Sequence, residues 1–326
     1  MAATLSQQEQ LELLDALADG QWHSGEALAA RFGVSRAALS KRVERLREWQ
    51  LEVESRQGLG YRLSAPIERL DAQRLQAAVP QLPLQVLPIV ESTNTLLLAC
   101  GAEQDPQALL AEFQSGGRGR RGRQWISPFG ANLYLSLSWS WPSWPRQLTA
   151  LSLAVGVACA QALRRCGLST LQLKWPNDLL VAGRKLGGVL IEHRGEAGGS
   201  CRVVIGIGLN LRMAATQGEA VSQPWINLDE ALRLENQPPA ARNEVAAALL
   251  QSLHGLLDGY AEQGFAAVAA QWSALDACRD RPVLIVQHDH TQSAIARGVD
   301  SDGALLVDIE NRRERLLSGE VSLRPA

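Results

Sequence analysis

This sequence of 326 residues lacks the features of secreted, membrane-spanning and zinc-binding proteins. No apolar run reaches the roughly 18 uninterrupted residues of a membrane span, and the polar start has neither the basic nor the apolar region of a signal peptide. The cysteines form no C-x-x-C pair of the kind found in metal and redox sites. They are Cys100, Cys159, Cys166, Cys201 and Cys278. We therefore expect a cytoplasmic protein with reduced, mostly buried thiols, no metal site of its own and no membrane contact.

Neither sign of charge dominates, because 32 Lys and Arg residues and 34 Asp and Glu residues give a formal net charge of −2. A net charge this small gives no general attraction to nucleic acid or acidic membranes, so anion binding must depend on local clusters. The hydrophobic share of 46% and the charged share of 20% are ordinary for a globular protein. At about 150 residues per domain, the length predicts two or three domains.

The first 65 residues predict a helix-turn-helix followed by a β-hairpin. Ser24 and Ser35 are placed to cap two successive helices with a tight turn between them. The second of these helices has an apolar stripe at helical spacing, made of Leu39, Val43, Leu46 and Trp49. Residues 51–63 alternate between apolar and polar positions around a glycine-containing turn, which is typical of a hairpin wing.

Two further domains follow the first. Residues 66–278 mix strand-like runs with long helical stretches rich in Ala and Leu, which predicts a mixed α/β domain. Residues 279–326 consist of short alternating runs separated by Asp and Gly turns, which predicts a small β-barrel. The expected fold class is therefore α/β (α+β), with a winged helix-turn-helix at the N-terminus.

The most unusual segment is SGGRGRRGR at 115–123, which has four arginines, four glycines and no acidic residue. Glycines allow close backbone approach, and guanidinium groups bind phosphate or carboxylate oxygens in bidentate geometry. An exposed basic loop or a nucleic-acid patch would have the same composition. The loop lies between two apolar strand-like runs, which favours a lid that orders over an anionic ligand. The chain has neither the phosphate-binding loop G-x-x-x-x-G-K-[ST] nor the dinucleotide motif G-x-G-x-x-G at a strand-to-helix turn.

Three motifs together resemble biotin protein ligases: GRGRRGR at 117–123 before Trp125, KWPND at 174–178, and KLGG at 185–188. The N-terminal helix-turn-helix and the final SGEVSLR segment at 318–324 narrow the resemblance to the bifunctional BirA type, which is both a ligase and a biotin operon repressor. The resemblance covers nearly the whole chain. It implies a ligase domain of the biotin/lipoate type and an SH3-like barrel at the C-terminus. It also implies ATP, biotin and Mg²⁺ as ligands.

The resemblance implies roles for particular residues. Those implied to bind biotin are Ser92, Thr93, Asn94, Gln114, Gly117, Arg118, Gly119, Arg120 and Lys185. Short polar side chains such as the first three suit the ureido head, whose N–H and C=O groups need partners once buried. The same three could instead cap a helix that follows, and both roles are compatible.

Other residues are implied to hold ATP or the adenylate: Arg118, Arg121, Trp125, Lys174, Asn177, Asn210, Trp225 and Arg324. Trp225 would stack on adenine, although a tryptophan packed at the surface would look the same in sequence. Gly206 and Gly208 would let a flat ring approach a strand, or they could mark a bulge. Asn177 could likewise be a plain turn former.

Lys185, Arg120 and Asp178 are the implied catalytic residues. ATP must convert the biotin carboxylate into a mixed anhydride, and fixed cations would stabilise charge on the α-phosphate as the carboxylate attacks. Asp178 would orient the lysine amine of a biotin carboxyl carrier protein. From its surroundings alone, Lys185 could be a solvated lysine beside a hairpin turn.

The second helix of the helix-turn-helix would read operator DNA through Ser35, Arg36, Ser40, Lys41 and Arg42. A helical bundle for protein contacts is the alternative. The resemblance implies a homodimer whose formation depends on the adenylate, although the aromatic run WSWPSWP at 139–145 departs from the family near the expected dimer surface. Two rival functions are a lipoate ligase and a sensor that binds biotin and DNA without catalysis.

Overall fold

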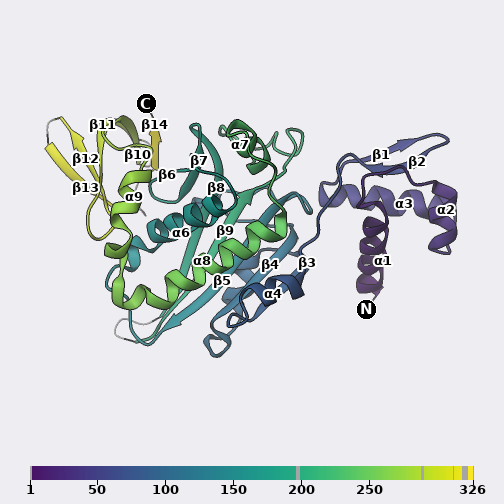
Figure 1. Cartoon of the computed structure of the whole chain (residues 1–326), viewed down its shortest axis with the longest axis horizontal. Helices are drawn as coiled ribbons and strands as arrows, with labels where there is room; N and C mark the ends of the chain where they lie inside the picture. Colours follow the sequence, from purple (N-terminus) through teal and green to yellow (C-terminus); the bar gives the residue numbers. More distant parts are fainter. Residues whose placement is uncertain (1, 196–198, 288–289, 311, 318–321, 326) are drawn as a thin grey trace.

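The computed structural model describes residues 2–195, 199–287, 290–310, 312–317 and 322–325, so the part of the final motif at 318–321 lies outside it. Figure 1 shows a small helical unit at the N-terminus, a large central sheet with helices, and a small sheet at the C-terminus. No helix in the described residues is long and apolar enough to cross a membrane.

The N-terminal unit is a helix-turn-helix followed by an antiparallel hairpin, as predicted. Ser24 and Ser35 cap the second and third helices, because each side chain accepts a hydrogen bond from a backbone N–H in the first turn. The third helix ends at Leu46, and a 3-10 turn carries the chain on to Trp49, which is buried. The elements are α1 (Ala2–Leu17), α2 (Gly25–Arg31), α3 (Arg36–Leu46), η1 (Arg47–Trp49), β1 (Val53–Arg56) and β2 (Gly60–Leu63).

Seven strands form the central mixed sheet in the order β3-β4-β5-β9-β8-β7-β6. β3 pairs in parallel with β4, and the other neighbours are antiparallel. β3 accommodates Pro88 because it is an edge strand, which tolerates the missing backbone N–H. The strands are β3 (Leu84–Val90), β4 (Gln107–Gln114), β5 (Asn132–Trp141), β6 (Gln172–Lys174), β7 (Asp178–Val181), β8 (Arg184–Arg194) and β9 (Cys201–Asn210).

Helices cover both faces of this sheet. The long helices α6 and α8 pack on one face, where the main hydrophobic core lies (Figure 1). The short α5 packs on the other face, where its Leu97 contacts Leu109 and Val204. The helices are α4 (Ala72–Ala78), α5 (Thr93–Ala99), α6 (Leu151–Arg165), α7 (Leu228–Leu234), α8 (Arg242–Gln263) and α9 (Ala269–Leu275), with 3-10 turns η2 (Ala102–Gln104), η3 (Arg120–Gly122), η4 (Leu148–Ala150) and η5 (Phe265–Ala267).

The C-terminal unit is a five-stranded antiparallel sheet in the order β13-β12-β11-β10-β14. The described pairings leave this order open between β13 and β14, so the expected closure into a barrel is not among them. Trp175 ties the unit to the central domain by donating its indole N–H to the carbonyl of Gly303 at 3.0 Å. The strands are β10 (Pro282–Gln287), β11 (His290–Val299), β12 (Leu305–Ile309), β13 (Arg312–Leu316) and β14 (Ser322–Pro325).

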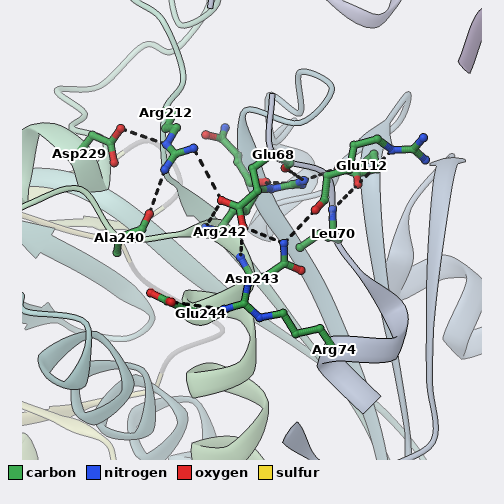
Figure 2. A network of polar contacts seen from close by, with 12 residues as sticks. Glu68, Leu70, Arg74, Glu112, Arg212, Asp229, Ala240, Arg242, Asn243 and Glu244 are labelled. Atoms are coloured by element: carbon green, nitrogen blue, oxygen red, sulfur yellow. Dashed lines mark hydrogen bonds and ion pairs between the residues drawn. The ribbon is translucent and has the colours of Figure 1, made fainter. Parts of the chain in front are cut away.

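A buried polar network fixes the segment that leads from the N-terminal unit into the sheet (Figure 2). Arg242 at the start of α8 forms an ion pair with Glu112 of β4, and it donates to the backbone carbonyl of Asn132 at 2.9 and 3.0 Å. Glu112 also accepts a hydrogen bond from the backbone N–H of Leu70 at 2.8 Å, and Glu68 accepts one from the backbone N–H of Arg242 at 2.7 Å. The connecting segment is therefore held on both sides by charged groups.

Apolar contacts join the N-terminal unit to the central domain. The rings of Trp49 and Phe129 stack with centroids 5.3 Å apart, and the backbone N–H of Phe129 donates to the Trp49 carbonyl at 3.0 Å. Phe113, at the end of β4, belongs to the same apolar cluster as the N-terminal helices. The 3-10 turn after α3 therefore packs directly against the turn that precedes β5 in the central domain.

Candidate active site

One cavity of about 570 Å³ brings together most of the residues selected from the sequence. It lies on the face of the sheet that carries α5, opposite the main core. The predicted site residues that line it are Ser92, Thr93, Asn94, Gln114, Arg118, Gly119, Arg120, Arg121, Trp125, Lys174, Asn177, Asp178 and Lys185.

Strand β9 forms part of the floor of the cavity, because its residues alternate between two faces. Ile207 belongs to the main core, whereas Gly206 and Gly208 point to the cavity side. A Cβ at 206 would lie 2.3 Å from Oδ1 of Asn94, and one at 208 would lie 2.4 Å from the Trp125 ring. The pairing with both neighbouring strands is continuous here. The two glycines therefore permit close approach to the strand and do not mark a bulge.

Neutral polar groups cluster where α5 begins. Ser92 caps α5 by accepting a hydrogen bond from the backbone N–H of Thr95 at 3.4 Å, and it also lines the cavity, so the two roles considered for it are compatible. The Oε1 atom of Gln114 accepts hydrogen bonds from the N–H and the hydroxyl of Thr93 at 2.9 and 3.1 Å. Nε2 of Gln114 donates to the buried hydroxyl of Ser127 at 3.1 Å. The sequence gave no reason to select Ser127.

Asn94 has both ends of its amide engaged. Its Nδ2 donates to Oε2 of Glu192 at 2.9 Å and to the Leu190 carbonyl at 3.4 Å, and its Oδ1 accepts from the Ser136 hydroxyl at 2.6 Å. Glu192 and Ser136 were missed in the sequence. The alternation of β8 was a usable signal, because Gly188 lines the cavity and Glu192 lies four residues further along the same face.

A second cluster consists of two lysines around one carboxylate. The ammonium nitrogens of Lys185 and Lys174 lie 2.6 and 2.7 Å from the two oxygens of Asp178. Burial opposes ionisation of Asp178, but Lys185 and Lys174 outweigh it and lower the pKa of this carboxyl. Asp178 is therefore a carboxylate at neutral pH, and the cluster carries one net positive charge.

The chain path explains how this cluster forms. β6 and β7 are joined by the turn at Pro176 and Asn177, which places Lys174 opposite Asp178. β7 and β8 are joined by the turn at Ala182 and Gly183, which brings Lys185 back beside Asp178. Asp178 lines the cavity from the first position of β7.

The arginine–glycine loop, residues 115–123, is folded against the cavity. Its own backbone closes it, because the N–H of Gly119 donates to the Arg123 carbonyl at 2.7 Å and the N–H of Trp125 donates to the Gly117 carbonyl at 2.9 Å. A Cβ on Gly117 would lie 2.5 Å from the Trp125 carbonyl, so this position requires glycine. Four arginines of the loop line the cavity, namely Arg118, Arg120, Arg121 and Arg123. The loop therefore presents several cations to one cavity.

Two of these arginines have contacts that fix their direction. Arg120 donates to Oδ1 of Asn177 at 3.2 Å, and burial, together with repulsion from Arg121, lowers the pKa of its guanidinium. Arg118 forms an ion pair of 2.7 Å with Glu192. Cations from the loop and from the lysine cluster therefore face the same space.

Trp125 provides an aromatic surface between these groups. Its ring lies against Gly208, and the ammonium of Lys185 stands 5.7 Å from the ring centroid. Such a distance is within the range of cation–π attraction. The indole therefore positions Lys185 as well as forming part of the cavity wall.

Four predicted residues lie outside the cavity lining. Gly117, within the loop, packs against the Trp125 carbonyl and the Ser127 hydroxyl. Asn210 donates to the carbonyls of Lys185 and Ile226 at 3.4 and 3.3 Å. The Trp225 ring lies against Gly218, although the backbone of Trp225 pairs with that of Lys185. The side chain of Arg324 lies outside the described part of the chain. In this structure Asn210 and Trp225 hold the backbone at Lys185.

The described His, Cys, Asp and Glu side chains are not arranged as a metal site. Among the described residues, no group of three or more His, Cys, Asp and Glu side chains is arranged to hold a metal ion. The carboxylate that lines the cavity, Asp178, is already paired with two lysines.

The predicted DNA-reading residues lie at the N-terminal end of α3. Arg36, Ser40 and Lys41 are exposed there, and Arg36 pairs with Glu26 at 2.8 Å. Ser35 is the helix cap. Arg42 is directed back toward α1, where it pairs with Glu9 at 2.9 Å and its side chain is only 15% exposed.

Three family models match successive parts of the chain. Residues 9–62 match the HTH domain, residues 86–210 match the Biotin/lipoate A/B protein ligase family, and residues 280–324 match the Biotin protein ligase C terminal domain. The three regions correspond to the N-terminal unit, to the sheet that holds the cavity, and to the C-terminal sheet.

Relatives match over nearly the full length. The chain is 41% identical to the Bifunctional ligase/repressor BirA of Salmonella typhimurium, over 97% of this chain and 98% of that protein. It is 40% identical to the protein of the same name from Escherichia coli, with 97% of each chain covered. The biotin protein ligase of Aquifex aeolicus, solved in complex with biotin and ATP, superposes with a TM-score of 0.63 and 26% identity, over 75% of this chain and 99% of that one. The chain belongs to the biotin protein ligase family, in its bifunctional ligase/repressor group.

Proposed function

We propose that this protein forms biotinyl-5′-adenylate from biotin and ATP and then transfers the biotinyl group to a lysine of the biotin carboxyl carrier protein of acetyl-CoA carboxylase. One observation carries the proposal: a single cavity has neutral hydrogen-bonding groups by Gly206 and cations by Gly188. Gly206 pairs with Leu190 of β8, which is two residues beyond Gly188 on the same strand. The neutral groups and the cations therefore lie two residues apart along β8. Biotin has the same order of groups, with a neutral ureido head at one end and a carboxylate at the other.

In the first step, a carboxylate oxygen of biotin attacks the α-phosphorus of ATP, and the bond to the pyrophosphate oxygen breaks. Negative charge increases on the α-phosphate oxygens during this attack, and preorganised cations lower the barrier. Lys185 and Arg120 are directed toward the cavity by Asp178 and Asn177 respectively. Because these partners already fix both cations, little reorganisation is needed when the phosphate arrives. ATP would enter as its magnesium complex.

In the second step, the amine of the carrier lysine attacks the acyl carbonyl of the adenylate, and AMP leaves. That amine has an ordinary pKa of about 10.4, so it must lose a proton before attack. Asp178 was expected to orient it. The two lysine contacts of Asp178 support a different role, in which Asp178 positions Lys185.

The test is to incubate the protein with biotin, ATP, Mg²⁺ and a carrier domain, and to weigh the carrier by mass spectrometry. A gain of one biotinyl group is expected. A carrier that gains a lipoyl group when lipoate is supplied, and no biotinyl group, would identify a lipoate ligase. Tight biotin binding with no change in carrier mass would identify a sensor.

The protein is further proposed to repress biotin synthesis genes as an adenylate-dependent homodimer. Exposed Arg36, Ser40 and Lys41 support contacts to operator DNA, whereas the ion pair of Arg42 with Glu9 supports a structural role for Arg42. Anisotropy titration of DNA from upstream of those genes, with and without biotin and ATP, tests this. Tighter binding with both ligands is expected, and Lys41→Ala should weaken it. Equal binding to unrelated DNA would refute it.

A further inference from the structure

Glu192 contacts two parts of the site that are far apart in sequence. Its Oε2 accepts a hydrogen bond from Nδ2 of Asn94 at 2.9 Å and forms an ion pair with Nη2 of Arg118 at 2.7 Å. Asn94 belongs to the first turn of α5, and Arg118 belongs to the arginine–glycine loop. One carboxylate oxygen therefore joins the neutral polar cluster to the loop.

The sheet fixes the position of Glu192. Gly188, Leu190 and Glu192 lie on one face of β8, because they pair with Gly208, Gly206 and Val204 of β9. The residue between, Ile191, packs against the main core on the other face. A rigid central strand therefore presents this carboxylate, whereas Arg118 is carried by a loop.

We propose that Glu192 is a positioning residue that holds the arginine–glycine loop over the bound adenylate through Arg118, and that it also fixes the amide of Asn94. The inference rests on the proposed ligase function, because the ligand that the loop covers is the adenylate. Asn94 cannot turn its amide over without placing its oxygen against the Glu192 carboxylate. Loss of Glu192 therefore releases the loop and lets the amide of Asn94 rotate.

The strength of the contact suits a reversible latch. The side chains of Arg118 and Glu192 are 42% and 26% exposed, so solvent screens their attraction. Exposed ion pairs of this kind contribute little free energy. Removing the charge of Glu192 should therefore shift the equilibrium between closed and open loop by only about threefold, toward the open loop. A contact of this strength biases the loop toward the closed position and still lets it open for biotin and ATP.

Two variants separate the contacts. Glu192→Gln keeps an oxygen that can accept from Asn94 but removes the charge that attracts Arg118, and Glu192→Ala removes both contacts. Glu244→Gln is the matched control, because Glu244 forms an exposed pair with Arg74 at 3.3 Å outside the cavity.

The first measurement is amide hydrogen exchange of residues 115–125 in the protein alone. Exchange at Gly119 and Trp125, whose N–H groups close the loop, should rise about threefold in Glu192→Gln and more in Glu192→Ala, and should not change in Glu244→Gln. Unchanged exchange in both Glu192 variants would overturn the inference, whatever the protein catalyses.

The second measurement is the rate at which preformed biotinyl adenylate leaves the protein. Glu192→Gln should release it about threefold faster, because the charge that attracts Arg118 is lost, and Glu192→Ala should release it at least as fast. Release at the wild-type rate in both Glu192 variants would overturn the inference. If the wild-type protein forms no adenylate at all, the proposed function fails, and the exchange measurement still decides whether Glu192 holds the loop.

Discussion

Breaking the buried pair of Arg242 and Glu112 should be among the most destabilising changes available in this chain. Their side chains are 2% and 1% exposed, so neither charge is solvated if its partner is removed. Arg242→Met would leave Glu112 with the N–H of Leu70 as its hydrogen-bond donor (Figure 2) and with Arg69, 3.9 Å away, as a distant ion-pair partner. It would also leave the carbonyl of Asn132 without the guanidinium. Removing one member of a buried ion pair typically costs about 3–5 kcal/mol.

The second single change, Glu112→Leu, should cost about as much, because it leaves a guanidinium buried and unpaired. The double variant should lose no more than either single variant, since it buries no uncompensated charge. Independent effects would instead sum to about 6–10 kcal/mol. The gap between these outcomes is large enough to measure.

The assay is denaturation in guanidinium chloride at pH 7, followed by circular dichroism, for the wild type, both single variants and the double variant. The matched control is Arg74→Met, which breaks an exposed pair with Glu244 and should cost no more than about 1 kcal/mol. Additive losses, or a single-variant loss as small as the control, would refute the reasoning that desolvation makes this pair critical.

Three further predictions concern the site and the pH dependence. Lys185→Ala should nearly abolish release of pyrophosphate in a single turnover, and a near-normal rate would contradict its role as the central cation. Arg120→Gly should let the adenylate escape and label unrelated lysines, and an adenylate off-rate equal to that of the wild type would argue against the loop as a cover. Burial opposes ionisation of Glu235, but hydrogen bonds from Ser169 and Thr170 lower its pKa from 4.5 to about 2, so its stabilising effect is full above pH 4.5 and is lost as the pH falls toward 2. The difference in unfolding free energy between wild type and Glu235→Gln should therefore shrink over that range, and a difference that stays constant would disprove the assignment.

Local sequence determined much of this protein. The caps at Ser24 and Ser35 and the apolar stripe of α3 set the helix-turn-helix, because capping and helical periodicity act within a few residues. Short motifs at 117–123, 174–178 and 185–188 contain the arginines and lysines that line the cavity. Glycine and proline limit the backbone locally, so turns and close approaches leave a direct trace in the sequence.

Tertiary structure decided which side chains meet. Glu192 contacts Asn94 and Arg118 only because the sheet order places β8 beside β9, against which α5 packs. Arg242 meets Glu112 across 130 residues of sequence. Contacts of this range depend on strand pairing and on the cost of burying an unpaired charge, and neither can be read from the residues on either side of a given position.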